Sequence, residues 1–191
     1  MIGRLDPQKG FDLAAAAAPR LVDAGIGLVV QGSGDPTIAE PFRRLAEDRP
    51  DRVALIERFD RAMARRIYAG TDLFLMPSRF EPSGQGQMIA LRYGTPPVVR
   101  RTGGLADTVV DVSASPGEGT GFVFEDASAA ALTEAVKRAA ALRADPAAWM
   151  ALVRRGMALD FSWERGSAPR YMAMYRRALE SQSPKRSARR V

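Results

Sequence analysis

Two apolar segments that each run into a polar, glycine-bearing loop organise the centre of this chain. Residues 72–77 read Asp-Leu-Phe-Leu-Met-Pro and continue into a loop at residues 78–87. Residues 97–99 read Pro-Val-Val and continue into Arg-Arg-Thr-Gly-Gly-Leu at residues 100–105. In an open parallel α/β sheet, ligands bind where strands end at their carboxyl side. The stretch therefore predicts two buried strands whose following loops lie side by side and form a ligand site.

Strand-like and helical patterns alternate along the rest of the chain. This order favours βαβ units and an α/β fold with a parallel sheet flanked by helices. Residues 2–5 read as the last part of a short first strand. Further strands are expected at residues 26–30, 53–56, 73–76, 97–99 and 122–124, and helices at residues 11–24, 37–47, 61–69, 88–93, 129–144, 146–159 and 163–179.

Composition excludes several classes of site. The 191 residues contain no cysteine and no histidine, so we expect no metal site of the usual zinc type and no imidazole base. The lack of cysteine fits a reducing compartment, and we expect a cytoplasmic protein. No apolar run approaches ~20 residues, so we expect no membrane span. The net charge is +6, much of it in residues 185–190. We interpret residues 181–191 as a disordered basic tail and consider nucleic-acid binding unlikely.

Arg4 and Lys9 are the first candidates for a functional role. Lys9 is expected in the first turn of a helix, where a cation opposes the helix dipole unless an anion lies in front of it. Arg4 lies at the end of the short first strand. The two side chains have the chemistry of a phosphate clamp, since Arg binds oxygens as a fork and Lys as a point charge. Two solvated surface cations are the alternative.

The central loops carry further candidates. Glu81 is followed by Pro82, which holds it in an extended conformation. A carboxylate fixed there suits hydrogen bonds to sugar hydroxyls or the stabilisation of positive charge; an ordinary loop glutamate is the alternative. The segment 102–104, Thr-Gly-Gly, offers successive backbone N–H groups to an anion or forms a plain turn. Residues 32–35 are rich in glycine but lack the spacing of a nicotinamide-binding loop.

An aromatic stripe follows near the end of the chain. Trp163, Tyr171 and Tyr175 are spaced by eight and four residues, which places them on one helix face. We interpret them as a packing stripe. Pro169 either kinks this helix or delays its start.

Six motifs occur along the chain in a fixed order: RLDPQKG at 4–10, GSGDP at 32–36, PSRFEPSG at 77–84, YGTP at 93–96, RRTGGLADT at 100–108 and DFSW at 160–163. With these motifs the chain resembles the C-terminal half of bacterial glycogen synthase and plant starch synthase, from residue 1 to about residue 179. The resemblance implies the C-terminal, Rossmann-like domain of a GT-B glycosyltransferase. It further implies transfer of glucose from ADP-glucose to the non-reducing end of an α-1,4-glucan, with retention and without a metal or other cofactor.

The resemblance also implies roles for single residues. Arg4 and Lys9 would bind the diphosphate and stabilise the leaving group, and Glu81 matches the family's essential acidic residue beside the sugar. Catalytic roles are thus expected for Arg4, Lys9 and Glu81, and substrate-binding roles for Phe59, which replaces a tyrosine stacked on adenine, and for Ser83, Gly84, Thr102, Gly103 and Gly104.

Two substitutions depart from the family pattern, since Ser83 and Gln85 replace a cysteine and a leucine. Ile89 stands where many related retaining transferases have a second glutamate, and this difference favours the glycogen synthase branch over the broader group. The larger departure is the absence of the N-terminal half of the GT-B fold. In the family, this missing partner supplies a histidine and the acceptor cleft. We expect residues 1–162 to bind the nucleotide sugar, with a truncated first strand, and residues 163–180 to form a closing helix. Without its partner we expect no transfer.

Two other functions remain open from the sequence. One is a related transferase that uses UDP-glucose. The other is a non-catalytic module that binds a nucleotide or a glucan. Competition between donors distinguishes the first alternative, and an activity assay distinguishes the second.

Overall fold

The computed structural model describes residues 1–115 and 117–182, and the chain divides into two units, residues 1–158 and residues 159–191. The predicted tail at 181–191 lies outside the described residues except for its first two positions, which belong to the last helix. The first unit contains the helices α1 (Phe11–Asp23), α2 (Pro36–Asp48), α3 (Arg61–Gly70), α4 (Gly86–Tyr93), α5 (Gly103–Thr108), α6 (Ala129–Arg143) and α7 (Pro146–Ala158), and the strands β1 (Leu28–Gln31), β2 (Val53–Ile56), β3 (Phe74–Met76), β4 (Pro97–Arg100) and β5 (Phe122–Phe124).

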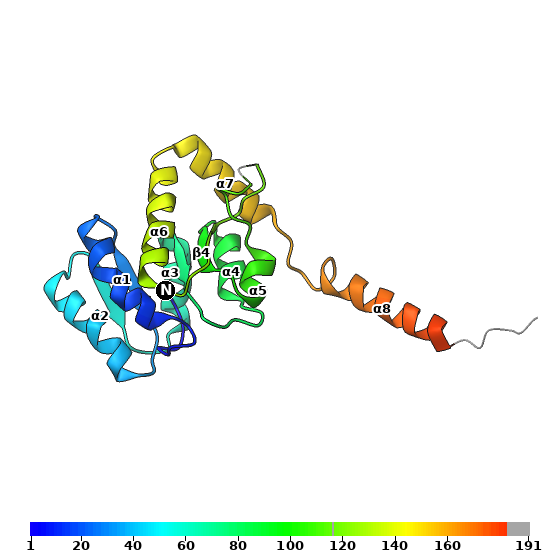
Figure 1. Ribbon diagram of the computed structural model, residues 1–191, viewed down its shortest axis with the longest axis horizontal. Helices are drawn as coiled ribbons and strands as arrows, with labels where there is room; N and C mark the ends of the chain where they lie inside the picture. The colour runs from blue at the N-terminus through cyan, green and yellow to red at the C-terminus, as the bar shows by residue number, and fades with distance from the viewer. Residues whose placement is uncertain (116, 183–191) are drawn as a thin grey trace, which may run out of the picture. The chain divides into compact units, whose positions relative to one another are not determined.

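The strands form two parallel sheets, one with the order β1-β2 and one with the order β3-β4-β5. Figure 1 shows β4 of the larger sheet between α4 and α6, both of which contact it. All pairs are parallel, as the alternation of strands and helices predicted. The first residues continue the smaller sheet, since Ile2 pairs with Gln31 and Leu5 with Gly34 as isolated bridges. The expected first strand is therefore reduced to two bridges.

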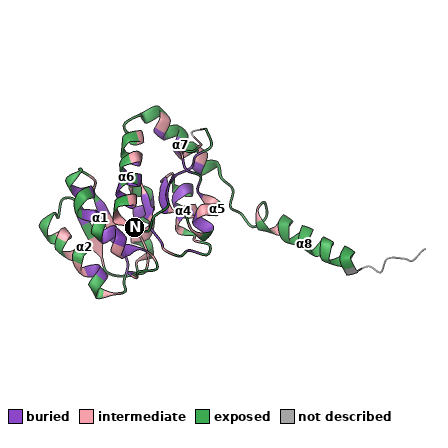
Figure 2. Ribbon diagram, viewed as in Figure 1, coloured by how far each residue is buried: buried purple, intermediate pink, exposed green. Residues whose placement is uncertain are grey.

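The three-stranded sheet is buried on both faces. Leu75 and Val98 lie in the main core, which also contains buried residues of α1 and α6. Phe74 and Val99 lie in two smaller clusters, with residues of α4 and α5. Because successive residues of a strand point to opposite faces, helices must cover both sides of this sheet. Figure 2 shows the buried residues along α1 and α4 that do so. This is the helix-flanked parallel arrangement expected from the sequence.

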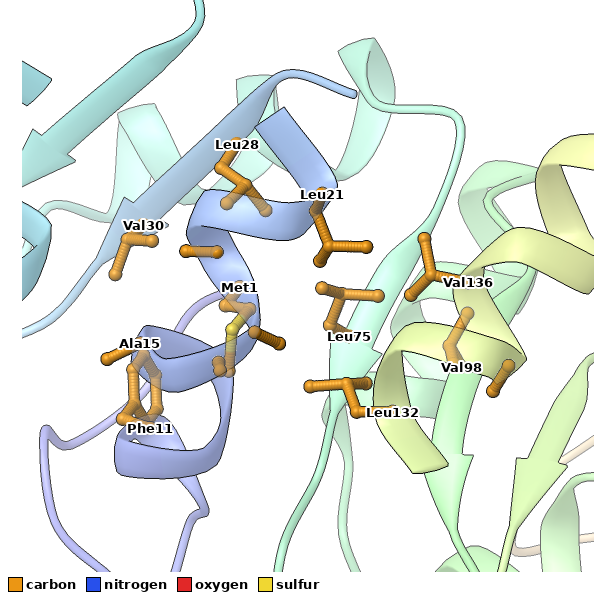
Figure 3. Close-up of a cluster of buried hydrophobic side chains, with 14 of the residues drawn as sticks. Met1, Phe11, Ala15, Leu21, Leu28, Val30, Leu75, Val98, Leu132 and Val136 are labelled. Atoms are coloured by element: carbon orange, nitrogen blue, oxygen red, sulfur yellow. The ribbon is translucent and has the colours of Figure 1, made fainter. Parts of the chain in front are cut away.

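The main core also joins the two sheets to each other. Val30 of β1 and Leu75 of β3 belong to one cluster together with Met1 and Leu132 of α6 (Figure 3). The N-terminal amine of Met1 donates a hydrogen bond to the carbonyl oxygen of Val29 at 2.8 Å. Met1 is buried, and this burial lowers the pKa of its amine to about 5 from the ordinary value of 8.0.

The buried amine makes stability depend on pH in a defined window. The folded chain binds the amine proton less readily than the unfolded chain, so its contribution is present above about pH 8 and is lost as the pH falls toward 5. We expect the free energy of unfolding to fall by roughly 4 kcal/mol across this window. The chain has no histidine, the side chain whose ordinary pKa lies within this window. Urea unfolding between pH 5 and 8 measures the effect, and Nα-acetylated protein should lack it. An equal slope in the acetylated protein would contradict the assignment.

Local capping sets several helix boundaries where the sequence predicted them. The Ser128 hydroxyl accepts a hydrogen bond from the Ala131 amide at the start of α6, as expected. Asp35 and Asp60 cap α2 and α3 in the same way. Such side chains satisfy N–H groups that a helix start leaves free.

The second unit contains helix α8 (Ser167–Gln182). The helix begins four residues later than the sequence pattern indicated, which places Pro169 in its first turn, where its missing N–H is tolerated. The rings of Trp163 and Tyr171 lie 5.3 Å apart, and those of Tyr171 and Tyr175 lie 6.2 Å apart. All three residues are exposed in this chain, and Trp163 lies before the helix and not on it. Their rings contact one another, and the packing of this stripe against another part of the protein stays a prediction. Within the described parts of the chain, no helix has the length and apolar character needed to span a bilayer.

Candidate active site

The two residues with the strongest predicted roles, Lys9 and Glu81, are in direct contact. The Lys9 ammonium donates a hydrogen bond to Oε2 of Glu81 at 2.5 Å, although 72 residues separate them in the chain. The Glu81 side chain is 7% exposed and the Lys9 side chain 27% exposed. The Ser78 hydroxyl lies 3.5 Å from the same carboxylate oxygen. Glu81 is therefore a buried, paired carboxylate, which an ordinary loop glutamate is not.

Lys9 does not lie in the first turn of its helix, as the sequence analysis expected. Helix α1 begins at Phe11, and Gly10 in a left-handed conformation precedes it. Lys9 instead belongs to the turn before the helix, where its backbone N–H donates to Oδ1 of Asp6 at 2.8 Å. This turn directs the lysine toward the Glu81 loop.

Arg4 is linked to the same turn through Asp6. Its guanidinium lies 3.3 Å from Oδ2 of Asp6, and its side chain is 70% exposed. Asp6 thus connects Arg4 to the backbone of Lys9. Arg4 is free to reorient toward a ligand at low cost, because a surface ion pair of this kind contributes little.

The loop of Glu81 packs directly on the segment from Thr102 to Gly104. The Gly104 amide donates to the carbonyl oxygens of Glu81 at 3.0 Å and of Pro82 at 3.2 Å. A Cβ atom at Gly104 would lie 2.0 Å from the Ser83 carbonyl oxygen, so only glycine permits this approach. The segment opens helix α5 and is not the plain turn that was considered. The Gly104 N–H is used within the protein, and it is not part of an open anion nest.

Gln87 holds the other end of the Glu81 loop, a role that the sequence did not reveal. It is fully buried in α4, and its Nε2 donates to the carbonyl oxygen of Ser83 and to the hydroxyl of Thr108, both at 3.1 Å. Its side chain also lies against Gly84, which has a positive φ of 70°. The amide therefore fixes the backbone at Ser83 and Gly84.

Phe59 lies on a different loop, which follows β2. Its ring is 78% exposed, and the Arg61 guanidinium lies 5.9 Å from the ring centre. Gln31, at the end of β1, is buried and donates from Nε2 to the carbonyl oxygens of Arg58 and Asp60 at 3.5 and 2.7 Å. Gln31 thus fixes the backbone on both sides of Phe59. A polar residue at the end of an apolar strand was the only sequence signal for it.

The structure therefore brings most of the predicted residues together. Lys9 contacts Glu81, and the segments 81–84 and 102–104 are in backbone contact with each other. Arg4 joins them through Asp6. Phe59 follows the carboxyl end of a strand in the neighbouring sheet.

A cavity of about 590 Å³ lies away from these residues. Its lining includes Leu28, Val53 and Leu73, at or next to the amino ends of their strands, together with Met1 and Trp149. Ligands of parallel α/β sheets bind at the opposite, carboxyl ends. The conjunction of Lys9 and Glu81 therefore defines the candidate site, and the cavity does not.

Comparison with known proteins identifies close relatives. Residues 1–141 match the family described as glycosyl transferases group 1. The chain is 54% identical over 176 residues to the glycogen synthase of Anaeromyxobacter sp. (strain K). The matched region covers 92% of this chain and 37% of that protein. It is 48% identical over 190 residues to the glycogen synthase of Desulforudis audaxviator, covering 99% of this chain and 38% of that protein. The resemblance predicted from the motifs is confirmed.

Solved structures show the same relationship. The catalytic domain of starch synthase IV from Arabidopsis thaliana, bound to ADP and acarbose, superimposes with a TM-score of 0.84 at 38% identity. The match covers 94% of this chain and 38% of that one. Sucrose-phosphate synthase from Thermosynechococcus elongatus gives a TM-score of 0.63 at 30% identity, over 94% of this chain and 44% of that one.

The chain spans somewhat more than a third of the length of the curated relatives that it matches. The family match nevertheless covers most of the first unit, including both sheets and every predicted site residue. The parallel sheets flanked by helices agree with the GT-B fold, through the structural match to the starch synthase neighbour. The chain belongs to the group 1 glycosyl transferases.

Proposed function

We propose that this chain is the donor-binding half of a glycogen synthase, which transfers glucose from ADP-glucose to the non-reducing end of an α-1,4-glucan with retention. The observation that carries the proposal is the contact between the Lys9 ammonium and the Glu81 carboxylate. It brings a cation suited to a phosphate and a buried carboxylate suited to a sugar within one hydrogen bond of each other. Glucosyl transfer from a nucleoside diphosphate glucose develops negative charge on the leaving diphosphate and positive charge on the sugar, and these two groups can stabilise both.

The chemistry of Lys9 supports a shared role. A lysine ammonium has three N–H donors and no acceptor. One donor is used by Glu81, which leaves two for oxygens of a diphosphate. Lys9 would thereby hold the leaving group beside Glu81 and stabilise the negative charge that develops on its oxygen. Arg4, exposed and linked to the same turn, would supply a fork-shaped contact to the diphosphate.

Glu81 would act on the sugar. When the bond between the sugar and the diphosphate breaks, positive charge develops at the anomeric carbon, and a nearby carboxylate stabilises it. The backbone at Ser83 and Gly84, which Gln87 fixes, would contact glucose hydroxyls. Thr102 and Gly103 would line the phosphate side of the site. Gly104 would hold this segment against the Glu81 loop. No cofactor or metal is part of this proposal.

ADP-glucose and an α-1,4-glucan are the proposed substrates, and Phe59 the proposed platform for adenine. The neighbouring starch synthase IV is described with ADP and acarbose, and the exposed ring of Phe59 suits stacking on a base. We propose a cytoplasmic location, because the chain contains no cysteine and its proposed donor is a nucleotide sugar.

Nucleotide binding tests this proposal directly. We expect Lys9→Ala and Arg4→Ala each to weaken ADP binding by about 1–3 kcal/mol, the scale of hydrogen bonds to charged groups. The loss should be larger for Lys9, which is less exposed, and it should shrink at high salt because the contacts are partly screened. Calorimetry with ADP measures both effects, and UDP in the same titration separates the two donor types.

Lys137→Ala is the matched control, since Lys137 pairs with Glu134 on the surface of α6. It should bind ADP as the parent chain does. Unchanged ADP affinity in both site variants would contradict the diphosphate clamp, and tighter binding of UDP than of ADP would favour the UDP-glucose alternative. Circular dichroism of each variant verifies that the fold is intact.

A further inference from the structure

A bidentate ion pair joins the two segments that carry Lys9 and Glu81. Nη1 and Nη2 of Arg79 donate to Oδ1 and Oδ2 of Asp12 at 2.6 and 2.7 Å, and Nη1 also donates to the carbonyl oxygen of Pro7 at 2.7 Å. Asp12 lies in the first turn of α1, and Arg79 lies two residues before Glu81. Fork-shaped pairs of this kind fix direction as well as distance.

Backbone contacts fix the same two segments in register. The Arg79 amide donates to the carbonyl oxygen of Gln8 at 2.8 Å, and Nε2 of Gln8 donates to the carbonyl oxygen of Phe80 at 3.4 Å. Lys9 lies between Gln8 and Asp12, so both of its flanks are tied to the Arg79 segment. The ammonium of Lys9 and the carboxylate of Glu81 meet in the middle of this arrangement.

The charges of the pair favour its formation. The Arg79 hydrogen bond lowers the pKa of Asp12 below its ordinary value, and the Asp12 hydrogen bond raises the pKa of Arg79. The carboxylate also lies at a helix N-terminus, which favours negative charge. The side chains of Asp12 and Arg79 are 38% and 37% exposed, whereas the Glu81 side chain is 7% exposed.

We propose that Asp12 and Arg79 are positioning residues, which hold the Lys9 ammonium on the Glu81 carboxylate without contacting the substrate themselves. This role rests on the proposed function, because it concerns the same site. The pair would fix the distance between the phosphate-binding and the sugar-binding group. Without the pair, the turn before α1 and the Glu81 loop would keep the hydrogen bonds of Gln8 and the Lys9–Glu81 bond itself, and would lose the bidentate contact that fixes their direction. Lys9 would then spend more time away from Glu81, exposed to solvent.

The reactivity of Lys9 tests this inference without any substrate. The chain contains three lysines, Lys9, Lys137 and Lys185, so peptide mass spectrometry resolves each of them. We would acylate the folded chain briefly with N-hydroxysuccinimidyl acetate and measure the rate at Lys9 relative to Lys137, which is 54% exposed. We expect Asp12→Asn to raise this ratio about three- to tenfold, the effect of losing a charge-assisted pair at a partly exposed position.

Two variants sharpen the experiment. Asp12→Glu keeps the carboxylate and should leave the ratio close to that of the parent chain. Asp23→Asn removes the other aspartate–arginine pair of the same helix, Asp23 with Arg49 at 3.0 Å, and should not change the ratio. An unchanged ratio in Asp12→Asn would overturn the inference. So would an equal rise in Asp23→Asn, because it would show a general loosening of α1.

A second measurement separates this inference from the proposed function. If the chain binds ADP, Asp12→Asn should weaken binding in the parent chain but not in a Lys9→Ala background, since the pair acts through Lys9. Weakening of equal size in both backgrounds would overturn the positioning role. If the chain does not bind ADP, the proposed function fails, while the acylation ratio still decides whether Asp12 and Arg79 position Lys9.

Discussion

Glu81→Gln is expected to abolish glucosyl transfer when this chain is combined with the N-terminal half of a glycogen synthase such as that of Anaeromyxobacter. The amide keeps the size of the side chain but cannot stabilise positive charge on the sugar. We expect a loss of about a thousandfold or more, comparable to the removal of a key electrostatic group from other active sites. ADP should still bind, because in the proposed function the lost charge faces the sugar, and because the Lys9 ammonium loses its charged partner and keeps its donors for the diphosphate.

The measurement is transfer of labelled glucose from ADP-glucose to glycogen, alongside calorimetry with ADP. Glu134→Gln is the control, since Glu134 forms the other described glutamate–lysine pair, with Lys137 at 2.9 Å. Turnover within a few-fold of the parent in Glu81→Gln would exclude a catalytic role for this carboxylate. Loss of ADP binding together with transfer would mean that Glu81 supports the fold of the site and not the chemistry.

The parent chain alone serves as the blank in this assay, and we expect no transfer from it. Positioning of the acceptor and exclusion of water both require a second wall facing the site. Transfer that appears only after the two halves are mixed would support the two-domain site. Robust transfer by the chain alone would show that the residues described here are sufficient.

Gly10→Ala is expected to destabilise the first unit by about 3 kcal/mol or more, through strain and a direct clash. Gly10 has a φ of 70°, and a Cβ atom there would lie 2.0 Å from the carbonyl oxygen of Pro77. The residue cannot move away, because α1 begins immediately after it and the Arg79 segment lies against the preceding turn. Urea unfolding measures the loss.

Gly25→Ala separates the two causes. Gly25 has a similar φ of 83°, but a Cβ atom there would meet nothing within 4 Å. Gly25→Ala should therefore lower the free energy of unfolding only by the cost of the left-handed conformation, about 1–2 kcal/mol. Equal losses in the two variants would show that the contact between Gly10 and Pro77 contributes nothing.

The sequence predicted the strands and most helices because their signals are local. The apolar run at residues 53–56 and the capping residue Ser128 act within a few residues of where they stand. The helix at Gly103 was missed, since two glycines in a row disfavour helix and only contact with the Glu81 loop explains it. Lys9 was predicted in the first turn of the helix and lies in the turn before it, for a similar reason. Gly10 separates the turn from α1, and its conformation depends on packing against Pro77.

For the candidate site too, the sequence identified residues that belong to motifs and missed residues whose role depends on distant contacts. Glu81 and Lys9 were identified from their motifs, but their hydrogen bond joins segments 72 residues apart and no local pattern encodes it. Gln31 and Gln87 were missed altogether, because a buried glutamine reads as an ordinary polar residue until its partners are known. Contacts between segments far apart in the chain cannot be predicted from the local patterns of a single sequence.

The separation of Lys9 and Glu81 along the chain also bears on how ligand and fold depend on each other. A molecule that binds both side chains at once closes a loop of 72 residues, much as a reversible cross-link would. An unfolded chain cannot offer both groups at the same distance, so such a ligand binds the folded state alone and shifts the folding equilibrium by mass action. Donor concentration would then set how long each molecule survives before it unfolds, and the supply of nucleotide sugar would regulate abundance as well as turnover.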